Sequence, residues 1–232
     1  MLLLVQGQAE LEGIRAWRCT GWEEALAGRF QAGRIPLLVR DDLDDLAGTH
    51  PTVLVDARMR KRQEPPVQLH QAPLVLGIGP GFVAGMHVHA VIESNWGPAL
   101  GTVLWHGQAQ AYTGEHRLVQ GKGRERYIYA PGSGRFRTDC TLLQAVRAGQ
   151  VVGWVDEAPL RAEIGGVLRG LASAGLQVSA GAKVAEIDPT GDPSHGRGIG
   201  ERPRAIARGV LQAIVEKWPE LAGAALGGAG AP

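Results

Sequence analysis

The stretch APGSGRFRTDCTLLQAVRAGQVVGWVD, residues 130–156, is followed five residues later by AEIGGVLRGLASAGLQVSAGAKVAEID, residues 162–188. Aligned without a gap, the two stretches are identical at eight of 27 positions and are therefore two copies of one β-rich unit. Arrays of such units need three or more copies to cover their apolar faces, so two copies must bury theirs against each other. This predicts a small flattened β-barrel with internal two-fold pseudosymmetry, whose shared core contains Val146, Val152, Val178 and Val184.

The paired units resemble the barrel-sandwich hybrid domain of biotinyl and lipoyl carriers. Those carriers attach their cofactor to a lysine in the hairpin between the two halves. Here that junction, residues 157–161, reads EAPLR and contains no lysine, while Lys183 lies near a different turn. We therefore expect residues 126–190 to form a domain of this lipoyl/biotinyl-like fold, without attached biotin or lipoate.

The first predicted domain, residues 1–125, contains short apolar runs of the kind that form strands. These runs are 35–39, 53–55 and 74–76. A helical face follows Thr20, whose spacing from Glu23 is that of a capping box. Strand, helix and further strands predict part of an α/β layer. Because the first thirty residues contain no glycine-rich strand-to-helix turn, the first unit of a dinucleotide fold is missing and the layer is an incomplete Rossmann-like one.

A dense glycine loop, GIGPGFVAG, spans residues 77–85. Glycine allows close approach and positive φ, so this loop can bring backbone N–H groups to a phosphate, although a tight structural turn explains the spacing equally well. His87 and His89 follow on one strand face and are candidate metal ligands. The sequence fixes no third ligand, so structural histidines are the favoured interpretation and no metal site is predicted.

Residues 191–232 form the last predicted segment. A glycine-rich loop leads to a helix that starts near Pro203 and carries one apolar stripe, Ile206, Val210, Ile214 and Trp218. We expect this helix to pack on the first domain and the chain after Leu221 to form a frayed tail.

Arginines crowd the start of this helix, where the helix dipole disfavours cations, which suggests a bound anion. Solvated surface arginines are the alternative. If the helix returns to the first domain, its arginines approach the glycine loop and form a phosphate-binding cleft. The residues predicted to line the cleft are Gly77, Gly79, Pro80, Gly81, Phe82, His89, Arg204 and Arg208.

Composition excludes several classes of protein. Of 232 residues, 44% are apolar, enough for a real core, and the formal charge of +1 gives no reason to expect a nucleic acid or a membrane as partner. No stretch approaches 18 apolar residues. Cys19 and Cys140 are the only cysteines, which fits a reducing compartment and predicts a cytoplasmic protein. No nucleophile motif identifies catalytic residues.

Several segments together resemble the accessory proteins of the selenium-dependent molybdenum hydroxylase system, distantly related to xanthine dehydrogenase accessory proteins. The matching segments are 53–57, 72–82, 88–93, 112–114, 164–171 and 204–206. The sequence departs from the family in lacking the first Rossmann unit, and His87 and Tyr112 stand where the family has Asp and Asn.

This resemblance implies a role in the maturation of molybdenum hydroxylases. The chain would bind a phosphorylated pterin such as molybdopterin, and its partner would be the hydroxylase or its maturation machinery. The alternative is a non-catalytic structural or interaction module that lost nucleotide binding with the first Rossmann unit.

The junction between the repeats generates a first prediction. Intact-mass analysis after co-expression with biotin and lipoate ligases should show the unmodified mass, because residues 157–161 offer no lysine. A mass gain that maps to Lys183 would contradict this expectation.

Overall fold

In a computed structural model, the described residues are 7–28, 33–40, 49–58, 61 and 63–223. The chain divides into two compact units, one of Met1–Val39 with His116–Ile199 and the other of Arg40–Glu115 with Gly200–Pro232. Each unit is described by itself. No helix among the described residues is both long and apolar enough to cross a membrane. Residues 224–232, for which a frayed tail is predicted, lie outside the described residues.

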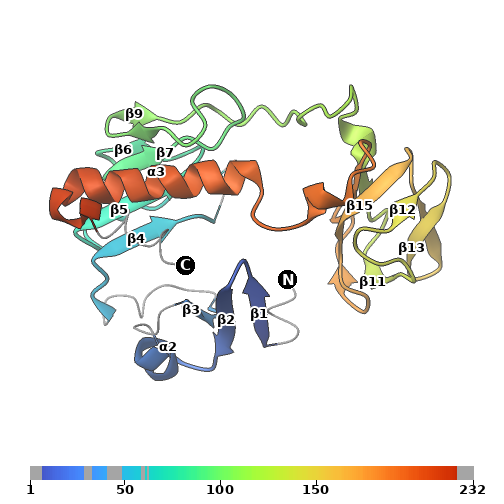
Figure 1. Cartoon of the computed structure of the whole chain (residues 1–232), viewed down its shortest axis with the longest axis horizontal. Helices are drawn as coiled ribbons and strands as arrows, with labels where there is room; N and C mark the ends of the chain where they lie inside the picture. The colour runs from blue at the N-terminus through green and yellow to red at the C-terminus, as the bar shows by residue number, and fades with distance from the viewer. Residues whose placement is uncertain (1–6, 29–32, 41–48, 59–60, 62, 224–232) are drawn as a thin grey trace. The chain divides into compact units, whose positions relative to one another are not determined.

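The described chain consists mostly of small sheets with few helices, so the predicted fold class is wrong (Figure 1). Residues 1–125 do not form one incomplete Rossmann-like layer. Their strands belong to separate sheets, and the long helix that packs on one of these sheets comes from the end of the chain. Short apolar runs predict strands correctly but do not specify which strands pair, and pairing decides the architecture.

The first small sheet consists of β1 (Gln8–Leu11), β2 (Ile14–Cys19) and β3 (Arg34–Leu38). β1 and β2 are antiparallel, while β2 and β3 are parallel and joined through α2 (Trp22–Gly28). The acid that bonds Thr20 is Glu24 rather than Glu23, whose spacing predicted the capping box. Glu24 Oε2 accepts from Thr20 N at 2.9 Å and from Thr20 Oγ1 at 3.0 Å.

The repeat region, residues 127–188, folds into two four-stranded sheets that curl around one core as a half-barrel (Figure 1). Its strands are β10 (Tyr127–Tyr129), β11 (Gly134–Arg137), β12 (Ala145–Val146), β13 (Val151–Val155), β14 (Ala158–Arg161), β15 (Gly166–Leu171), β16 (Gln177–Val178) and β17 (Lys183–Asp188). One sheet has the order β10-β17-β15-β12 and the other β14-β13-β11-β16. Short 3-10 helices flank this region at Arg124–Arg126 and Pro193–Gly196.

Strand pairing in the half-barrel repeats with the same offset that separates the two sequence copies. The equivalent pairs are Gly134 with Val178 and Gly166 with Val146, then Phe136 with Val155 and Leu168 with Ile187. Val146, Val152 and Val184 are buried in one apolar cluster, and Val178 packs against it. The prediction that these four valines share a core is confirmed, because each copy covers the apolar face of the other.

The second unit has a sheet of order β4-β5-β7-β8, in which the first three strands are parallel and β8 is antiparallel. The strands are β4 (Val53–Asp56), β5 (Leu74–Ile78), β7 (Ala90–Ile92) and β8 (Val103–Leu104). A separate two-stranded antiparallel sheet pairs β6 (Val83–Ala84) with β9 (Gly107–Gln108). Every residue of β5 is buried, because apolar clusters cover both faces of the sheet. A strand covered on both faces has a continuous apolar sequence, as LVLGI does.

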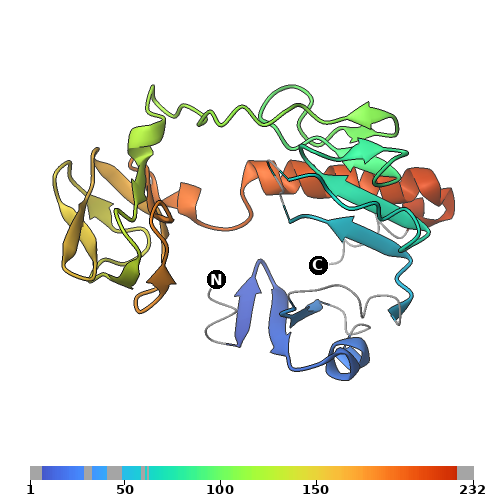
Figure 2. The same ribbon diagram turned by 180° about the vertical axis from the view of Figure 1, so that it is seen from behind.

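The helix α3 (Glu201–Lys217) covers one of these faces (Figures 1 and 2). Its stripe of Ile206, Val210 and Ile214 packs on the same cluster as Leu76 and Ile92. At Gly209 a side chain would collide with the Gly101 carbonyl oxygen, so glycine allows the helix to approach the sheet closely. A short 3-10 helix, Pro219–Leu221, follows α3.

The last aspartate of each repeat has a different environment. Asp188 is buried and accepts hydrogen bonds from Thr190 N at 2.9 Å, Thr190 Oγ1 at 2.7 Å and His195 Nδ1 at 2.9 Å. Its equivalent, Asp156, is exposed and accepts from Arg135 N at 2.9 Å. Burial alone would raise the pKa of Asp188, but the hydrogen bonds from Thr190 and His195 outweigh it and lower this pKa.

Asp188→Asn should lower the free energy of unfolding of the half-barrel by about 1–3 kcal/mol at pH 7, because a buried ionised acceptor is lost. Asp156→Asn is the matched control and should change it by less than about 0.5 kcal/mol. Since the folded pKa of Asp188 is lowered, its stabilisation is present above the unfolded pKa of about 3.9 and lost as pH falls through the folded pKa. Urea unfolding followed by the near-ultraviolet circular dichroism of the full chain measures both effects. Equal losses in the two variants, or a gap that widens below pH 4, would contradict this account.

Candidate ligand-binding site

The carboxyl ends of three parallel strands lie at one edge of the β4-β5-β7 sheet. Asp56 ends β4, the glycine turn 77–82 begins within β5, and Glu93 with Ser94 follows β7. Ligands of open sheets of parallel strands bind outside this edge, because the loops that leave the strands there form a crevice. The predicted glycine loop is therefore placed where a ligand site is expected.

Two glycines of the turn are required by packing. The buried ring of Phe82 lies against Gly77, so closely that a Cβ at position 77 would collide with it. Gly79 has φ of +81° and lies against the Ser94 side chain, which again leaves no room for a Cβ. Its N–H donates to Ile92 O at 2.9 Å. Because of these contacts the chain doubles back over the end of β5. Packing therefore accounts for the need for glycine at positions 77 and 79, and no ligand is required to explain it.

Gly81 differs from the other two. It is exposed, has φ of +97°, and lines a cleft of about 550 Å³. Within the described residues its N–H donates to no protein acceptor.

The cleft, called here the glycine-turn cleft, has walls from three segments of the second unit. Its lining residues are Lys61, Gln63, Glu64, Pro65, Pro80, Gly81, Val83, Met86, His87, Gln108, Ala109, Ala111 and Tyr112. The Lys61 ammonium lies 4.7 Å from the centroid of the Tyr112 ring. The cleft thus combines a cation, a backbone donor and an apolar wall that includes Met86 and Tyr112.

Buried carboxylates near the cleft already have partners. Glu93 accepts from Asn95 N at 2.7 Å through Oε1 and from Gln110 N at 2.8 Å through Oε2, so it ties the loop after β7 to the cleft wall. Asp56 accepts from the Arg58 backbone at 3.1 Å and from its guanidinium Nε at 2.9 Å. This hydrogen bond raises the pKa of Arg58. Both carboxylates have structural roles, and among the described lining residues of the cleft the acid is Glu64.

The two histidines accept backbone hydrogen bonds. His87 Nδ1 accepts from Val83 N, and His89 Nδ1 accepts from Val75 N, both at 3.0 Å. An imidazole that accepts through Nδ1 carries its proton on Nε2, so both rings are held in one tautomer. Burial, and then the charge of Lys217, lower the pKa of His89. Among the described residues no cluster of three or more His, Cys, Asp or Glu can hold a metal ion.

The predicted cleft residues do not all come together. Gly77, Gly79, Pro80, Gly81 and Phe82 form one turn. His89 precedes β7 and pairs with the start of β5, so it lies at the opposite edge of the sheet from this turn.

The arginine that reaches the sheet edge differs from those predicted. Arg202 donates from Nε to Ser94 O at 2.6 Å, and Ser94 lies against Gly79. The predicted Arg204 and Arg208 lie on the exposed side of α3. The predicted first residue of a helix specifies on which helical turn each arginine lies, but it does not specify the direction of the arginine side chain.

Sequence reasoning also missed Lys61 and the position of Tyr112. A signal for Lys61 exists in the sequence, because RMRKR, residues 58–62, places four cations in five residues shortly after the apolar run 53–55. Residues 59, 60 and 62 lie outside the described residues.

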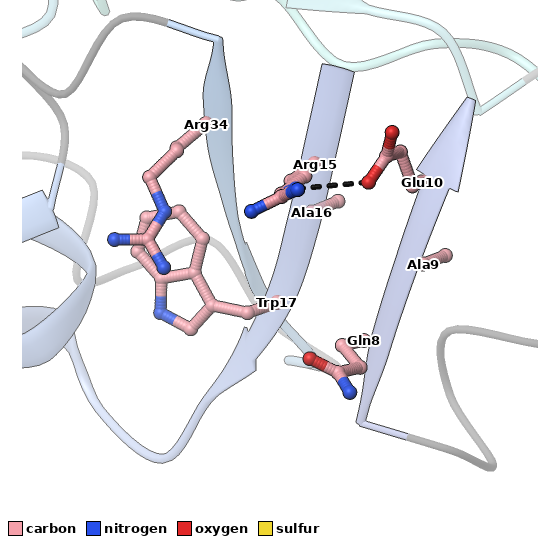
Figure 3. A pocket seen from close by; sticks show the side chains of 7 residues that line it. All are labelled: Gln8, Ala9, Glu10, Arg15, Ala16, Trp17 and Arg34. Carbon is pink, nitrogen blue, oxygen red and sulfur yellow. Dashed lines mark hydrogen bonds and ion pairs between the residues drawn. The ribbon is translucent and has the colours of Figure 1, made fainter. Parts of the chain in front are cut away.

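A second hollow, of about 420 Å³, lies on the β1-β2-β3 sheet (Figure 3). The Arg34 guanidinium is 5.2 Å from the centroid of the Trp17 ring, and Arg15 Nε donates to Glu10 Oε2 at 2.8 Å. Because Arg34 lies over the tryptophan ring, that ring face is not an open stacking platform. This hollow is the weaker candidate.

Comparison with known proteins gives one curated relative. No protein-family model matches the chain. The chain is 36% identical over 209 residues to the uncharacterized protein YqeB of Escherichia coli strain K12. The match covers 90% of this chain but only 38% of YqeB, so the chain spans less than half the length of that relative.

Solved structures match over short stretches. An aspartoacylase family protein from Mesorhizobium loti is 22% identical, with a TM-score of 0.24 over 30% of this chain and 27% of that chain. A succinylglutamate desuccinylase/aspartoacylase from Rhodobacter sphaeroides is 24% identical, with a TM-score of 0.26 over 37% and 29% of the two chains. Similarity at this level establishes neither the fold nor the function of this chain.

These comparisons correct the expected family. No family model matches the chain and the curated relative is an uncharacterized protein, so no comparison supports a molybdenum hydroxylase accessory family. The assignment to the selenium-dependent molybdenum hydroxylase accessory family is wrong. The inferred role in molybdenum hydroxylase maturation rested on that assignment and is wrong with it.

Proposed function

We propose that the second unit binds a small organic anion in the glycine-turn cleft. The observation that supports this most is the presence in one cleft of the Gly81 N–H, which has no acceptor among the described residues, and the Lys61 ammonium. A backbone donor at positive φ beside a cation is a recurring anion-binding arrangement.

The wall of the cleft indicates the rest of the ligand. Met86 and Tyr112 are 56% and 39% exposed and line the cleft together with Val83. Exposed apolar side chains in a concave site favour a ligand with an apolar or aromatic body, since its burial supplies affinity that the anion alone lacks. The anion of such a ligand is a phosphate or a carboxylate, and both suit the same donors.

The cations in the sequence support the same ligand. Lys61 belongs to the run of four cations that follows β4, whereas the buried Asp56 at the end of that strand is neutralised by Arg58. In the lining of the cleft, Glu64 is the acid beside Lys61. Among the described lining residues, the Lys61 ammonium and the Gly81 N–H are thus opposed by the Glu64 carboxylate alone.

We also place the protein in the cytoplasm. Its two cysteines are both free thiols and Cys19 is buried, which suits a reducing compartment.

Isothermal titration calorimetry with phenyl phosphate and with phenylacetate tests the proposal. At least one should bind, and Lys61→Gln should weaken that binding by about tenfold, as loss of a charge-assisted hydrogen bond does. Inorganic phosphate should bind more weakly than phenyl phosphate, because it leaves the apolar wall unused.

Lys122→Gln is the matched control, because Lys122 is an exposed lysine of the other unit. It should bind both compounds as the parent does. The proposal is wrong if the parent binds neither compound, or if Lys61→Gln and the parent bind equally well.

A further inference from the structure

The half-barrel has a seam where an edge strand of each sheet borders one hollow. β10 is the edge of one sheet and β14 the edge of the other, and a hollow of about 290 Å³ lies between them. Its lining residues are Arg124, Tyr127, Ile128, Tyr129, Pro131, Pro159, Leu160, Arg161 and Glu163. All of them belong to the first unit.

The repeat explains why two edges meet there. β10 precedes the first copy and β14 precedes the second, at the same offset, so Ile128 corresponds to Leu160 and Tyr129 to Arg161. Ile128 and Leu160 are both buried in the shared core. The outer residues that alternate with them line the hollow. The seam is therefore formed by equivalent strands of the two copies.

The two edges do not pair with each other. Among the described strands, β10 pairs only with β17 and β14 only with β13. Pro159 lies in β14 and has no N–H, and proline on an edge strand prevents a neighbour from completing the ladder. The half-barrel consequently stays open along this seam.

The backbone of β10 is oriented to accept a new strand. Ala130 N donates to Ala182 O at 2.8 Å and Ala130 O accepts from Gly181 N at 2.8 Å, so Ala130 uses both of its backbone groups on the β17 side. Backbone groups of successive residues in a strand point in opposite directions. The N–H and C=O of Tyr129 therefore point towards the open edge.

Cations lie over the two tyrosines of β10 that line the hollow. The Arg124 guanidinium carbon lies 3.7 Å from the centroid of the Tyr129 ring, and Lys183 Nζ lies 3.6 Å from that of Tyr127. Arg161 lines the same hollow, where Glu163 is the acid, and Arg161 Nη1 donates to Gly149 O at 3.0 Å. Positive charge predominates along the seam and is complementary to an acidic partner.

We propose that this seam binds an extended acidic peptide segment of a partner protein, which adds as a strand beside β10. Main-chain hydrogen bonds to Tyr129 would fix the strand, and Arg124 with Arg161 would select its carboxylates. β10 has three residues, so the added strand would be about three to five residues long. This binding does not depend on the anion proposed for the glycine-turn cleft, which belongs to the other unit.

Fluorescence anisotropy with labelled peptides tests this on the full chain. The acidic peptide Ac-EVEVE-NH2 should bind, and Ac-KVKVK-NH2 should bind at least about tenfold more weakly because its charges are reversed. A version of the acidic peptide with alternate backbone nitrogens methylated keeps the charge but cannot form a ladder. It should lose binding by a similar factor.

Variants of the protein test whether the acidic peptide binds at the seam. Arg161→Gln should weaken binding of the acidic peptide about fivefold, whereas Arg135→Gln, which changes an exposed arginine of β11 that does not line the hollow, should not. Equal binding of the methylated and unmethylated peptides would overturn the proposal, because affinity would then come from charge alone. Tighter binding of a proline-rich peptide, or no binding of the acidic peptide, would overturn it as well.

Discussion

The close approach of side chains to Gly77 and Gly79 is the constraint on which the glycine-turn cleft depends. The Phe82 ring occupies the space above Gly77, and the Ser94 side chain occupies the space beside Gly79. Phe82 is itself fixed in the cluster that covers one face of the parallel sheet. The turn can therefore double back only because these two positions have no side chain, and this conformation brings Gly81 to the cleft.

A different constraint organises the half-barrel. Each sequence copy has an apolar face that it cannot cover alone, so the two copies close around one core and their strand pairs repeat. The same duplication brings two equivalent edge strands to one seam, where, among the described strands, neither has a partner on its open side. Pro159 prevents those edges from pairing with each other, which leaves backbone and charge exposed in one place.

The sequence predicted the features that depend on local pattern or on internal repetition. The repeat specified the shared valine core because equivalent positions must have equivalent burial, and the apolar stripe of α3 specified its buried face. The favoured structural role of His87 and His89 agrees with the backbone hydrogen bonds that both rings accept. In each of these cases the spacing of residues along the chain contains the information.

The sequence did not predict what depends on pairing between distant segments. Three apolar runs suggested one α/β layer, but the strands separate into different sheets. His89 was grouped with the glycine turn although the parallel register places it at the opposite edge. Arg202, rather than Arg204 or Arg208, reaches Ser94, because side-chain direction at the first turn of a helix follows from packing and not from spacing.

The central claim is that an anion binds at Gly81, and nitrogen-15 NMR of the full chain tests it most directly. Addition of whichever of phenyl phosphate and phenylacetate binds should move the Gly81 amide resonance more than those of Gly77 and Gly79, whose positions are explained by packing alone. Resonances of Lys61 and Tyr112 should move with it at the same ligand concentration. Shifts confined to residues 116–199, or a Gly81 amide that does not move at saturation, would contradict the account.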